Sequence, residues 1–110
     1  MENAQSQMRK GVLELVILAI LSREPAYPSD IINRLKETQM IVVEGTLYPL
    51  LTRLKNSGHL DYTWQESSSG PPRKYYALTE KGKEFYQTLT ESWALLVQSV
   101  NQTIQNQTKS

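Results

Sequence analysis

The chain has 110 residues, 39% of them hydrophobic, which limits it to one small domain with a modest core. Its 12 basic and 11 acidic side chains leave a net charge of +1, which excludes a positive field over the whole molecule, so any nucleic-acid-binding surface must be local. The absence of cysteine excludes disulfides, thiolate metal sites and cysteine nucleophiles.

The apolar run over residues 11–21 is too short to span a bilayer and is interrupted by Glu14, and no signal-peptide cleavage pattern follows it. We therefore expect a soluble, cytoplasmic protein with no membrane partner. The one histidine, His59, has no second histidine or thiolate with which to share a metal ion, so we expect it to hydrogen-bond locally. Scattered carboxylates supply no convincing catalytic constellation, so we expect neither an enzyme nor a cofactor.

The first predicted helix covers residues 8–21. Its apolar side chains surround nearly the whole circumference, which predicts burial on more than one side, and a second subunit would suit one of those sides. Pro25 and Pro28 then break the chain. A second helix is predicted from about Ser29 to Thr38, capped by Ser29 or the residue before it, with an inner face formed by Ile31, Ile32 and Leu35.

A third helix is predicted within the stretch VEGTLYPLLTRLKNSGHL, residues 43–60, after a short apolar link over residues 40–43 that favours an extended conformation. Gly58 ends this helix because glycine readily takes the left-handed conformation that follows a last helical turn. The predicted inner face consists of Leu47, Leu50, Leu51 and Leu54. The predicted outer face consists of Tyr48, Thr52, Arg53, Lys55 and Asn56.

Two strands are predicted next, over residues 60–65 and 74–78, because apolar and polar side chains alternate there. The small, turn-forming residues 66–72 between them are too many for a tight two-residue hairpin and predict an exposed lobe, with Arg73 and Lys74 at its base. We expect Trp64, on the first strand, to pack beneath this hairpin.

Two helices joined by a short connection and followed by a two-stranded hairpin form a winged helix-turn-helix. We therefore predict a mainly α (α+β) fold in two parts. Residues 1–79 form the winged helix-turn-helix domain that binds DNA, and residues 80–110 form a C-terminal dimerisation helix with a frayed tail.

The last helix carries a seam of apolar residues. Thr79 is its predicted cap and Gly82 a weak point within it. Apolar side chains then follow a three-four spacing typical of a coiled coil, namely Tyr86, Leu89, Trp93, Leu96, Val100 and Ile104 or Thr103. This seam is longer than so small a domain can cover, which predicts a partner chain. The simplest partner is a second copy, and a twofold dimer would present two reading helices to a palindromic site.

Several separated motifs resemble the PadR family of transcriptional regulators. They are Gly45-Thr-Leu-Tyr-Pro-Leu-Leu51 with Arg53-Leu54 and Gly58, the hairpin segment Gly70-Pro-Pro-Arg-Lys-Tyr-Tyr76, and Leu78-Thr-Glu-Lys-Gly82. The resemblance covers residues 8–93 and is closest to the short second subfamily, which has a single C-terminal helix. It implies a DNA-binding regulator, habitually a repressor, that dimerises through the last helix with help from the first. The predicted dimer interface comprises Met8, Val12, Leu15, Tyr86, Leu89, Trp93, Leu96, Val100 and Ile104.

Two positions depart from the family pattern. Tyr27 is followed by Pro28 and Ser29, where the family usually has a Tyr-Gly-Tyr type segment, so the second aromatic and its contact are absent. Val43 and Glu44 stand where Ser-Pro is frequent. The sequence leaves two roles open for Glu44, which either accepts a hydrogen bond from cytosine or points away from the phosphates that repel it.

The outer face of the third helix has the residue types that major-groove reading needs. Gly45 allows close approach of the backbone, and the Tyr48 hydroxyl suits a phosphate oxygen. The residues expected closest to base edges are Thr46, Pro49, Thr52 and Arg53. Arg73 and Lys74 are expected to hold the hairpin to the DNA backbone or minor groove, with Ser68 and Gly70 at its tip. Lys55, Lys81 and Lys83 are either phosphate contacts or solvated charges.

The resemblance also places Trp93 where some short PadR-like regulators hold flat aromatic compounds between paired tryptophans, which relieves repression. A small aromatic effector at this site would contact Trp93, Met8 and Leu15. Thr90 and Val97, one turn away on either side, add neither a ring nor a charge. We therefore favour the alternative in which Trp93 is an anchor of the dimer without a ligand.

The sequence thus predicts a sequence-specific, homodimeric transcriptional repressor that binds a palindromic operator in double-stranded DNA. The alternative is a winged helix used only for contact with another protein. Such modules lose the outward basic face, and Arg53, Arg73 and Lys74 argue against it.

Overall fold

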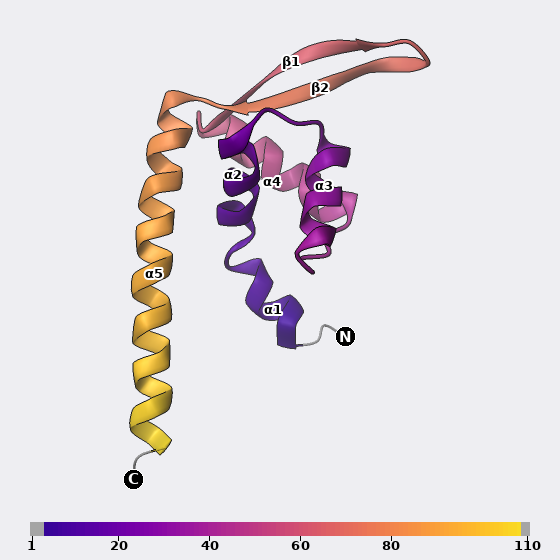
Figure 1. Cartoon of the computed structure of the whole chain (residues 1–110). Coiled ribbons are helices and arrows are strands. Elements are labelled where there is room, and N and C mark those ends of the chain that lie inside the picture. The colour runs from indigo at the N-terminus through magenta and orange to yellow at the C-terminus, as the bar shows by residue number, and fades with distance from the viewer. Residues whose placement is uncertain (1–3, 109–110) are drawn as a thin grey trace.

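The computed structural model describes residues 4–108. Four helices are followed by a hairpin and a long helix (Figure 1). The elements are α1 (Ala4–Lys10), α2 (Leu13–Arg23), α3 (Pro28–Glu37), α4 (Glu44–Asn56), β1 (Leu60–Ser67), β2 (Gly70–Leu78) and α5 (Glu80–Thr108). The predicted fold class is confirmed, because this is a mostly helical winged helix-turn-helix with a C-terminal helix.

The core lies where α2, α3 and α4 meet beneath the base of the hairpin. Each helix contributes its predicted apolar face, and the hairpin closes the core with Leu60 and Tyr76, which are both buried. The fully buried helical side chains are Ile17, Leu18, Ile31, Leu35, Leu47, Leu51 and Leu54. Leu50, predicted on the inner face of α4, is only half-buried. Burial of these aliphatic side chains is the main term that holds the three helices together.

The prediction of one continuous helix over residues 8–21 is wrong, because the structure has two helices there, α1 and α2. The backbone N–H of Gly11 donates to the Met8 carbonyl and that of Val12 to Arg9, at 3.3 and 2.9 Å. These bonds span three residues rather than four and close a tight turn, which glycine favours because it weakens a helix interior. Met8 therefore lies on α1, outside the buried run of α2, and is 78% exposed.

The second helix begins one residue earlier than predicted and is capped differently. Tyr27 occupies the N-cap, and the Asp30 carboxylate accepts a hydrogen bond from the Tyr27 backbone N–H at 3.1 Å. Ser29 is not the cap, because Pro28 already occupies the first helical position, where proline lacks only a donor that no helical bond would use. After α3, Gln39 adopts a positive φ of 65° and residues 40–43 form no regular element.

The hairpin is longer and its turn tighter than predicted. The strands pair antiparallel from Leu60 with Leu78 to Ser67 with Gly70, so only two residues form the turn. The expected lobe over residues 66–72 is therefore wrong. An irregularity in the pairing between Gln65 and Ser67 absorbs one residue, which lets Pro71 and Pro72 join the strand. Both prolines are tolerated because β2 is an edge strand of a two-stranded sheet.

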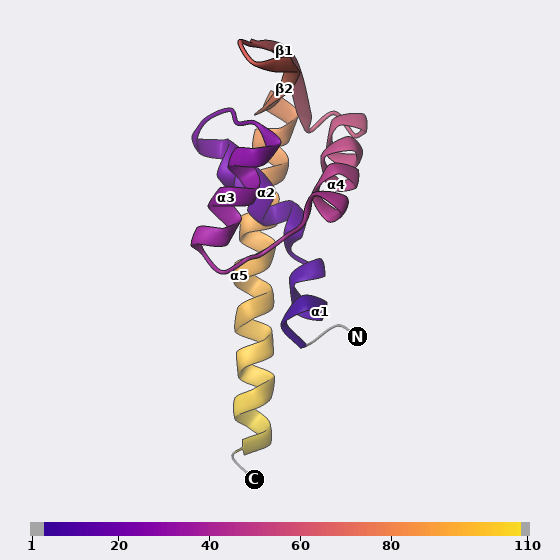
Figure 2. The same ribbon diagram turned by 90° about the vertical axis from the view of Figure 1, so that its right-hand side faces the viewer.

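Helix α5 leaves the base of the hairpin and runs past the helical body. Its first turns pack against α2, and its C-terminal half extends well beyond α2, α3 and α4 in two orthogonal views (Figures 1 and 2). Thr79 caps the helix as predicted, since its Oγ1 accepts a hydrogen bond from the Gly82 N–H at 3.0 Å. The proposed functional division at residue 79 stays a prediction.

Candidate nucleic-acid interface

The outer face of α4 is exposed along its length, on the flank of the molecule and below the hairpin (Figure 2). Four of the predicted side chains lie there and line a shallow depression together with Pro49, namely those of Tyr48, Thr52, Arg53 and Asn56. Lys55, also predicted on this face, is half-buried. At the start of the helix a β-carbon on Gly45 would meet no atom within 4 Å. The N-cap residue, Val43, makes no side-chain cap, so the first amides of α4 are open to an anion.

A hollow of about 370 Å³ separates α4 from the hairpin and brings several predicted residues together. Tyr48 and Thr52 line it from α4, and Arg73 and Lys74 line it from β2. The N-terminus of α3 forms the third wall through Tyr27, Pro28 and Ser29. Glu44 also lies at this hollow and is exposed, which places one negative charge at an otherwise cationic site.

Arg73 does not extend freely from the hairpin. Its guanidinium carbon lies 3.8 Å from the centroid of the Tyr27 ring, and that ring lies 4.8 Å from the Tyr75 ring. Stacking on an aromatic face fixes a guanidinium while leaving its edge for hydrogen bonds. Tyr27 thus positions Arg73, a role that the sequence analysis missed. The aromatic residue before Pro28 was the available signal.

Lys74 and Trp64 form a second cationic and aromatic pair across the hairpin. The Lys74 ammonium lies 4.6 Å from the Tyr62 ring centroid and 5.5 Å from that of Trp64. The prediction that Trp64 packs beneath the hairpin is wrong, because the side chain is 61% exposed and lines the hollow beside α4. Trp64 lies on the same face of β1 as Leu60 and Tyr62, but burial on that face decreases from Leu60 to Trp64 because the strand extends past the helical body.

The third cation of the surface, Arg53, is bound to a carboxylate. Its Nε donates to Oε1 of Glu14 on α2 at 2.7 Å, and Nη2 approaches the same oxygen. Arg53 lies on the outer face of α4, as predicted, but its contact with Glu14 was not expected. No local signal exists, because 39 positions separate the two residues.

The three lysines for which a phosphate contact was considered each contact another part of the protein. The Lys81 ammonium donates to the Ser57 carbonyl at 2.9 Å, and Lys83 pairs with Glu80 at 3.1 Å. Lys55 lies 5.5 Å from the Tyr62 ring centroid. Ser68 and Gly70 are exposed at the tip of the hairpin, as predicted.

Tyr76 closes the core directly beneath the hollow. It is 4% exposed, and its backbone exchanges two hydrogen bonds with Ala26, which ties the hairpin to the start of α3. Burial raises the pKa of its phenol, with smaller contributions from Tyr62 and Tyr48. The phenol therefore stays neutral, and the aromatic floor of the hollow adds no negative charge.

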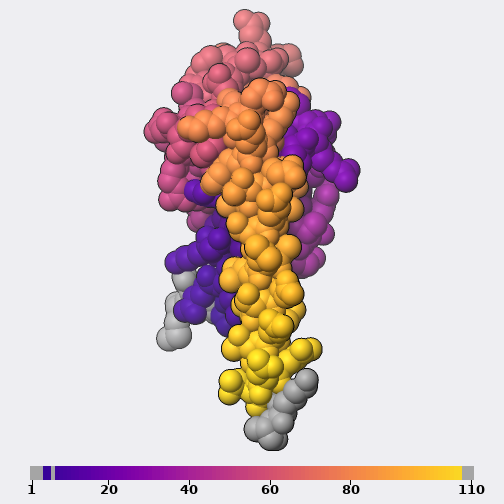
Figure 3. Space-filling model, turned by 90° about the vertical axis from the view of Figure 1, so that its left-hand side faces the viewer, coloured from indigo at the N-terminus to yellow at the C-terminus, as the bar shows by residue number. Residues whose placement is uncertain are grey.

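The apolar seam of α5 is exposed in this chain. Trp93, Leu96, Val100 and Ile104 are each 45–57% exposed. Helix α5 runs down one face of the molecule from the base of the hairpin (Figure 3). Tyr86 and Leu89, nearer the start of the helix, are half-buried against the core. The N-terminal part of the seam therefore packs within the chain and the remainder does not.

Beside Trp93 a small hollow of about 170 Å³ opens between α2 and α5. Leu15 and Trp93 line it, as the predicted effector site requires, together with Glu14 and Leu89. Met8 does not line this hollow, because the turn at Gly11 directs α1 away from it.

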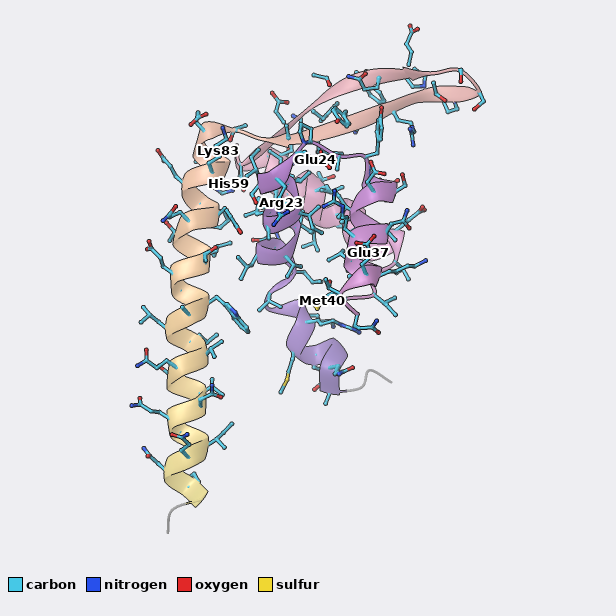
Figure 4. All side chains as sticks on the ribbon, in the orientation of Figure 1. Arg23, Glu24, Glu37, Met40, His59 and Lys83 are labelled. Carbon is cyan, nitrogen blue, oxygen red and sulfur yellow. The ribbon has the colours of Figure 1, made fainter. Side chains whose placement is uncertain are left out.

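His59 links the end of α4 to the start of α5 (Figure 4). Its ring stacks on Phe85 with centroids 4.1 Å apart. The expected local hydrogen bond of the ring is not seen at Nδ1, which is buried and has no partner among residues 4–108. The same described residues contain no cluster of three side chains able to hold a metal ion.

Comparison with known proteins assigns the chain to a family. The family model of the PadR-like transcriptional regulators matches residues 17–88, which is more than half of the chain. The protein belongs to the PadR-like family. The matched segment includes α3, α4, the whole hairpin and part of α2, so every element of the candidate interface lies within it.

Solved structures of PadR-like proteins agree with this assignment. A PadR-like transcription factor from Bacteroides fragilis is 61% identical, with a TM-score of 0.77, over 91% of this chain and 97% of that one. A PadR-like transcriptional regulator from Bacillus cereus is 40% identical, with a TM-score of 0.77, over 90% and 97%. A PadR family regulator from Eggerthella lenta is 33% identical, with a TM-score of 0.83, over 89% and 86%.

Membership of this family makes the chain a transcriptional regulator that binds DNA. The exposed face of α4, the cationic hollow and the hairpin are the parts of the PadR-like fold that suit a nucleic acid. Within residues 4–108 no helix is both long and apolar enough to cross a membrane.

Proposed function

We propose that the protein is a homodimeric repressor that binds a palindromic operator, with α4 in the major groove and the hairpin against the adjacent backbone or minor groove. The observation that carries this proposal is the continuity of one surface. The exposed face of α4 opens onto the same hollow as Arg73 and Lys74. A duplex seated on α4 would therefore bring its backbone to these two cations.

Different parts of this surface would perform different tasks. Thr46, Pro49, Thr52 and Arg53 would contact base edges, and the methyl groups of the threonines suit thymine. Gly45, Tyr48 and Lys55, with Arg73, Lys74, Ser68 and Gly70, would contact the backbone. Glu44 is exposed beside Tyr48. It would either accept a hydrogen bond from a cytosine amino group or point away from the phosphate that Tyr48 contacts, because a carboxylate repels that phosphate.

The exposed seam of α5 supports a twofold dimer. A helix that leaves the body with Trp93, Leu96, Val100 and Ile104 half-exposed presents an apolar stripe with coiled-coil spacing, and a second copy of the same stripe would cover it. Val12 and Leu15 lie beside Trp93 and Leu96 and would extend this interface. The projecting Met8 would reach the partner rather than its own α5.

A small hydrophobic ligand that releases the protein from DNA would bind at Trp93. The hollow there, about 170 Å³, is smaller than the roughly 300–1,000 Å³ usual for ligand sites. A ligand would therefore need a site completed by the partner chain. A dimer anchored by Trp93 without a ligand remains the favoured alternative.

Two measurements test the proposal. A selection from a random duplex library should enrich a palindromic sequence. The affinity of the protein for that sequence should fall steeply with added salt, because binding releases cations from the DNA and added salt opposes their release. Sedimentation at micromolar concentration should give a dimer. Enrichment of no sequence, with weak and salt-independent binding, would favour the alternative in which the winged helix contacts only another protein.

A further inference from the structure

The ion pair between Glu14 and Arg53 joins α2 to the reading face of α4. Arg53 approaches a single oxygen of Glu14 with two of its nitrogens, and its side chain is still 64% exposed. A guanidinium has five N–H donors, so the pair leaves donors that face solvent. Arg53 is thus held from one side and open on the other.

Glu14 is less free to move than its partner. Its side chain is only 29% exposed, and it lies at the rim of the hollow between α2 and α5, beside Leu15 and Trp93. Water stabilises a partly buried carboxylate less than a fully solvated one, so loss of its paired cation costs more free energy. The pair is therefore anchored on the α2 side.

The two arginines of the surface differ in this respect. Arg73 rests on the ring of Tyr27, and in the part of the chain that the structure describes no carboxylate pairs with it. Its charge is not offset by an ion pair and is available to a phosphate. The charge of Arg53 is offset by Glu14, whose second oxygen would repel a phosphate that came to the same guanidinium.

We infer that Glu14 is a specificity-determining residue, which withholds Arg53 from phosphates and reserves it for a base edge. A guanine offers two acceptors without a net charge, so it suffers less repulsion from Glu14 than a phosphate does. Glu14 thereby lowers affinity for DNA of any sequence more than affinity for the operator. This inference rests on the proposed placement of α4 in the major groove.

The test compares E14Q with the wild-type protein on two duplexes, the one enriched by selection and a scrambled duplex of the same composition. Loss of the carboxylate should tighten binding to the scrambled duplex about two- to five-fold, the range expected for one exposed ion pair. The salt dependence on that duplex should steepen by about 0.9 for each additional phosphate that the variant neutralises. The ratio of the two affinities should fall.

Two further variants separate this role from a change in net charge or in folding. E24Q removes the carboxylate of Glu24, which pairs with Arg34 at the end of α2. Neither of these residues lines a depression beside α4. E24Q should leave the affinity ratio unchanged. In an R53A background, E14Q should leave the affinity ratio unchanged, because Glu14 acts on specificity through Arg53 and its remaining repulsion of phosphates affects both duplexes alike. Circular dichroism would verify that each variant is folded.

The outcomes distinguish this inference from the proposed function. Salt-dependent binding by the wild-type protein with no change in E14Q would overturn the inference and leave the proposed function standing. An equal change of the affinity ratio in E24Q, or a change of the ratio in E14Q that persists without Arg53, would also overturn it. Absence of DNA binding by the wild-type protein would overturn both.

Discussion

Gly82 packs so closely against His59 that a β-carbon at residue 82 would overlap the His59 carbonyl oxygen. The contact lies where the end of α4 meets the start of α5. Thr79 reinforces it by donating its hydroxyl to the Gly58 carbonyl at 2.6 Å, and the Lys81 ammonium binds the Ser57 carbonyl. The end of α4 and the start of α5 are therefore joined by close contacts to the backbone of residues 57–59, which limit the angle between the two helices.

Gly82→Ala should destabilise the protein, although alanine favours a helix by about 1 kcal/mol over glycine. The added carbon meets backbone, which cannot yield without breaking the bond from the Thr79 N–H to the His59 carbonyl. We expect a net loss of about 1–3 kcal/mol in the free energy of unfolding, typical of overpacking, measured by urea denaturation.

Gly45→Ala is the matched control for this substitution. A β-carbon at Gly45 meets nothing within 4 Å, so the same change should leave stability unchanged or raise it by up to about 1 kcal/mol. Affinity for the selected duplex should nevertheless fall, because Gly45 lies where the backbone would approach DNA. Similar stability losses in both variants would contradict the role assigned to Gly82.

Arg73→Ala and Thr52→Ala should affect DNA binding in different ways. Arg73 lies on the hairpin and would meet phosphates, so its loss should weaken binding to all duplexes alike and reduce the salt slope by about 1. Thr52 faces outward from α4, and its loss should relax the preference at one base pair, a change of about 1–3 kcal/mol. Direct titration of the selected duplex and of its single-base variants at several salt concentrations measures both effects, and the reverse pattern would contradict these roles.

Helices and strands were predictable from the sequence because their apolar periodicity is local. Gly58 ends α4 with a φ of 84°, and Thr79 caps α5, both as expected from residue type. The tight turn of the hairpin was not predictable, because the irregularity in strand pairing after Gln65 leaves no signal in the composition. The partner of Arg53 was also beyond prediction, since it depends on the packing of α2 against α4, 39 positions away along the chain. The partner of Arg73 had a signal, the aromatic residue before Pro28, but its contact depends on the packing of α3 against the hairpin.

The raised pKa of Tyr76 predicts a pH dependence of stability. Because burial favours the neutral phenol in the folded state, its contribution is present below the ordinary pKa of about 10 and is lost as the pH rises through the folded value. Lysines also lose their charge in this range, so Tyr76→Phe is the comparison. The wild-type protein should lose more stability than the variant between about pH 9 and about pH 11, as measured by thermal denaturation. Parallel curves would contradict the assignment.

The two tryptophans allow the position of bound DNA to be tested by fluorescence, because they lie on different surfaces. Trp64 lies beside the cationic hollow and Trp93 on the seam of α5. In W93F, which retains only Trp64, addition of the selected duplex should change the fluorescence. In W64F, which retains only Trp93, the duplex should change it little. A response confined to Trp93 would place the DNA elsewhere.

Leu96→Glu should separate the two copies without disturbing the fold of either. Leu96 is 55% exposed on the seam and lies beyond the turns of α5 that pack against the core, so a charge there meets solvent in one chain but an apolar stripe in a dimer. Sedimentation should show a monomer with an unchanged helical spectrum. Binding to a palindromic duplex should weaken at least about tenfold, because the two reading helices no longer bind as one unit, whereas binding to a single half-site should change little.

Gln98→Glu is the matched control. It places the same charge at another exposed position of α5, outside the seam, and should leave the dimer intact. A dimer that persists in L96E would show that the seam of α5 is not the interface.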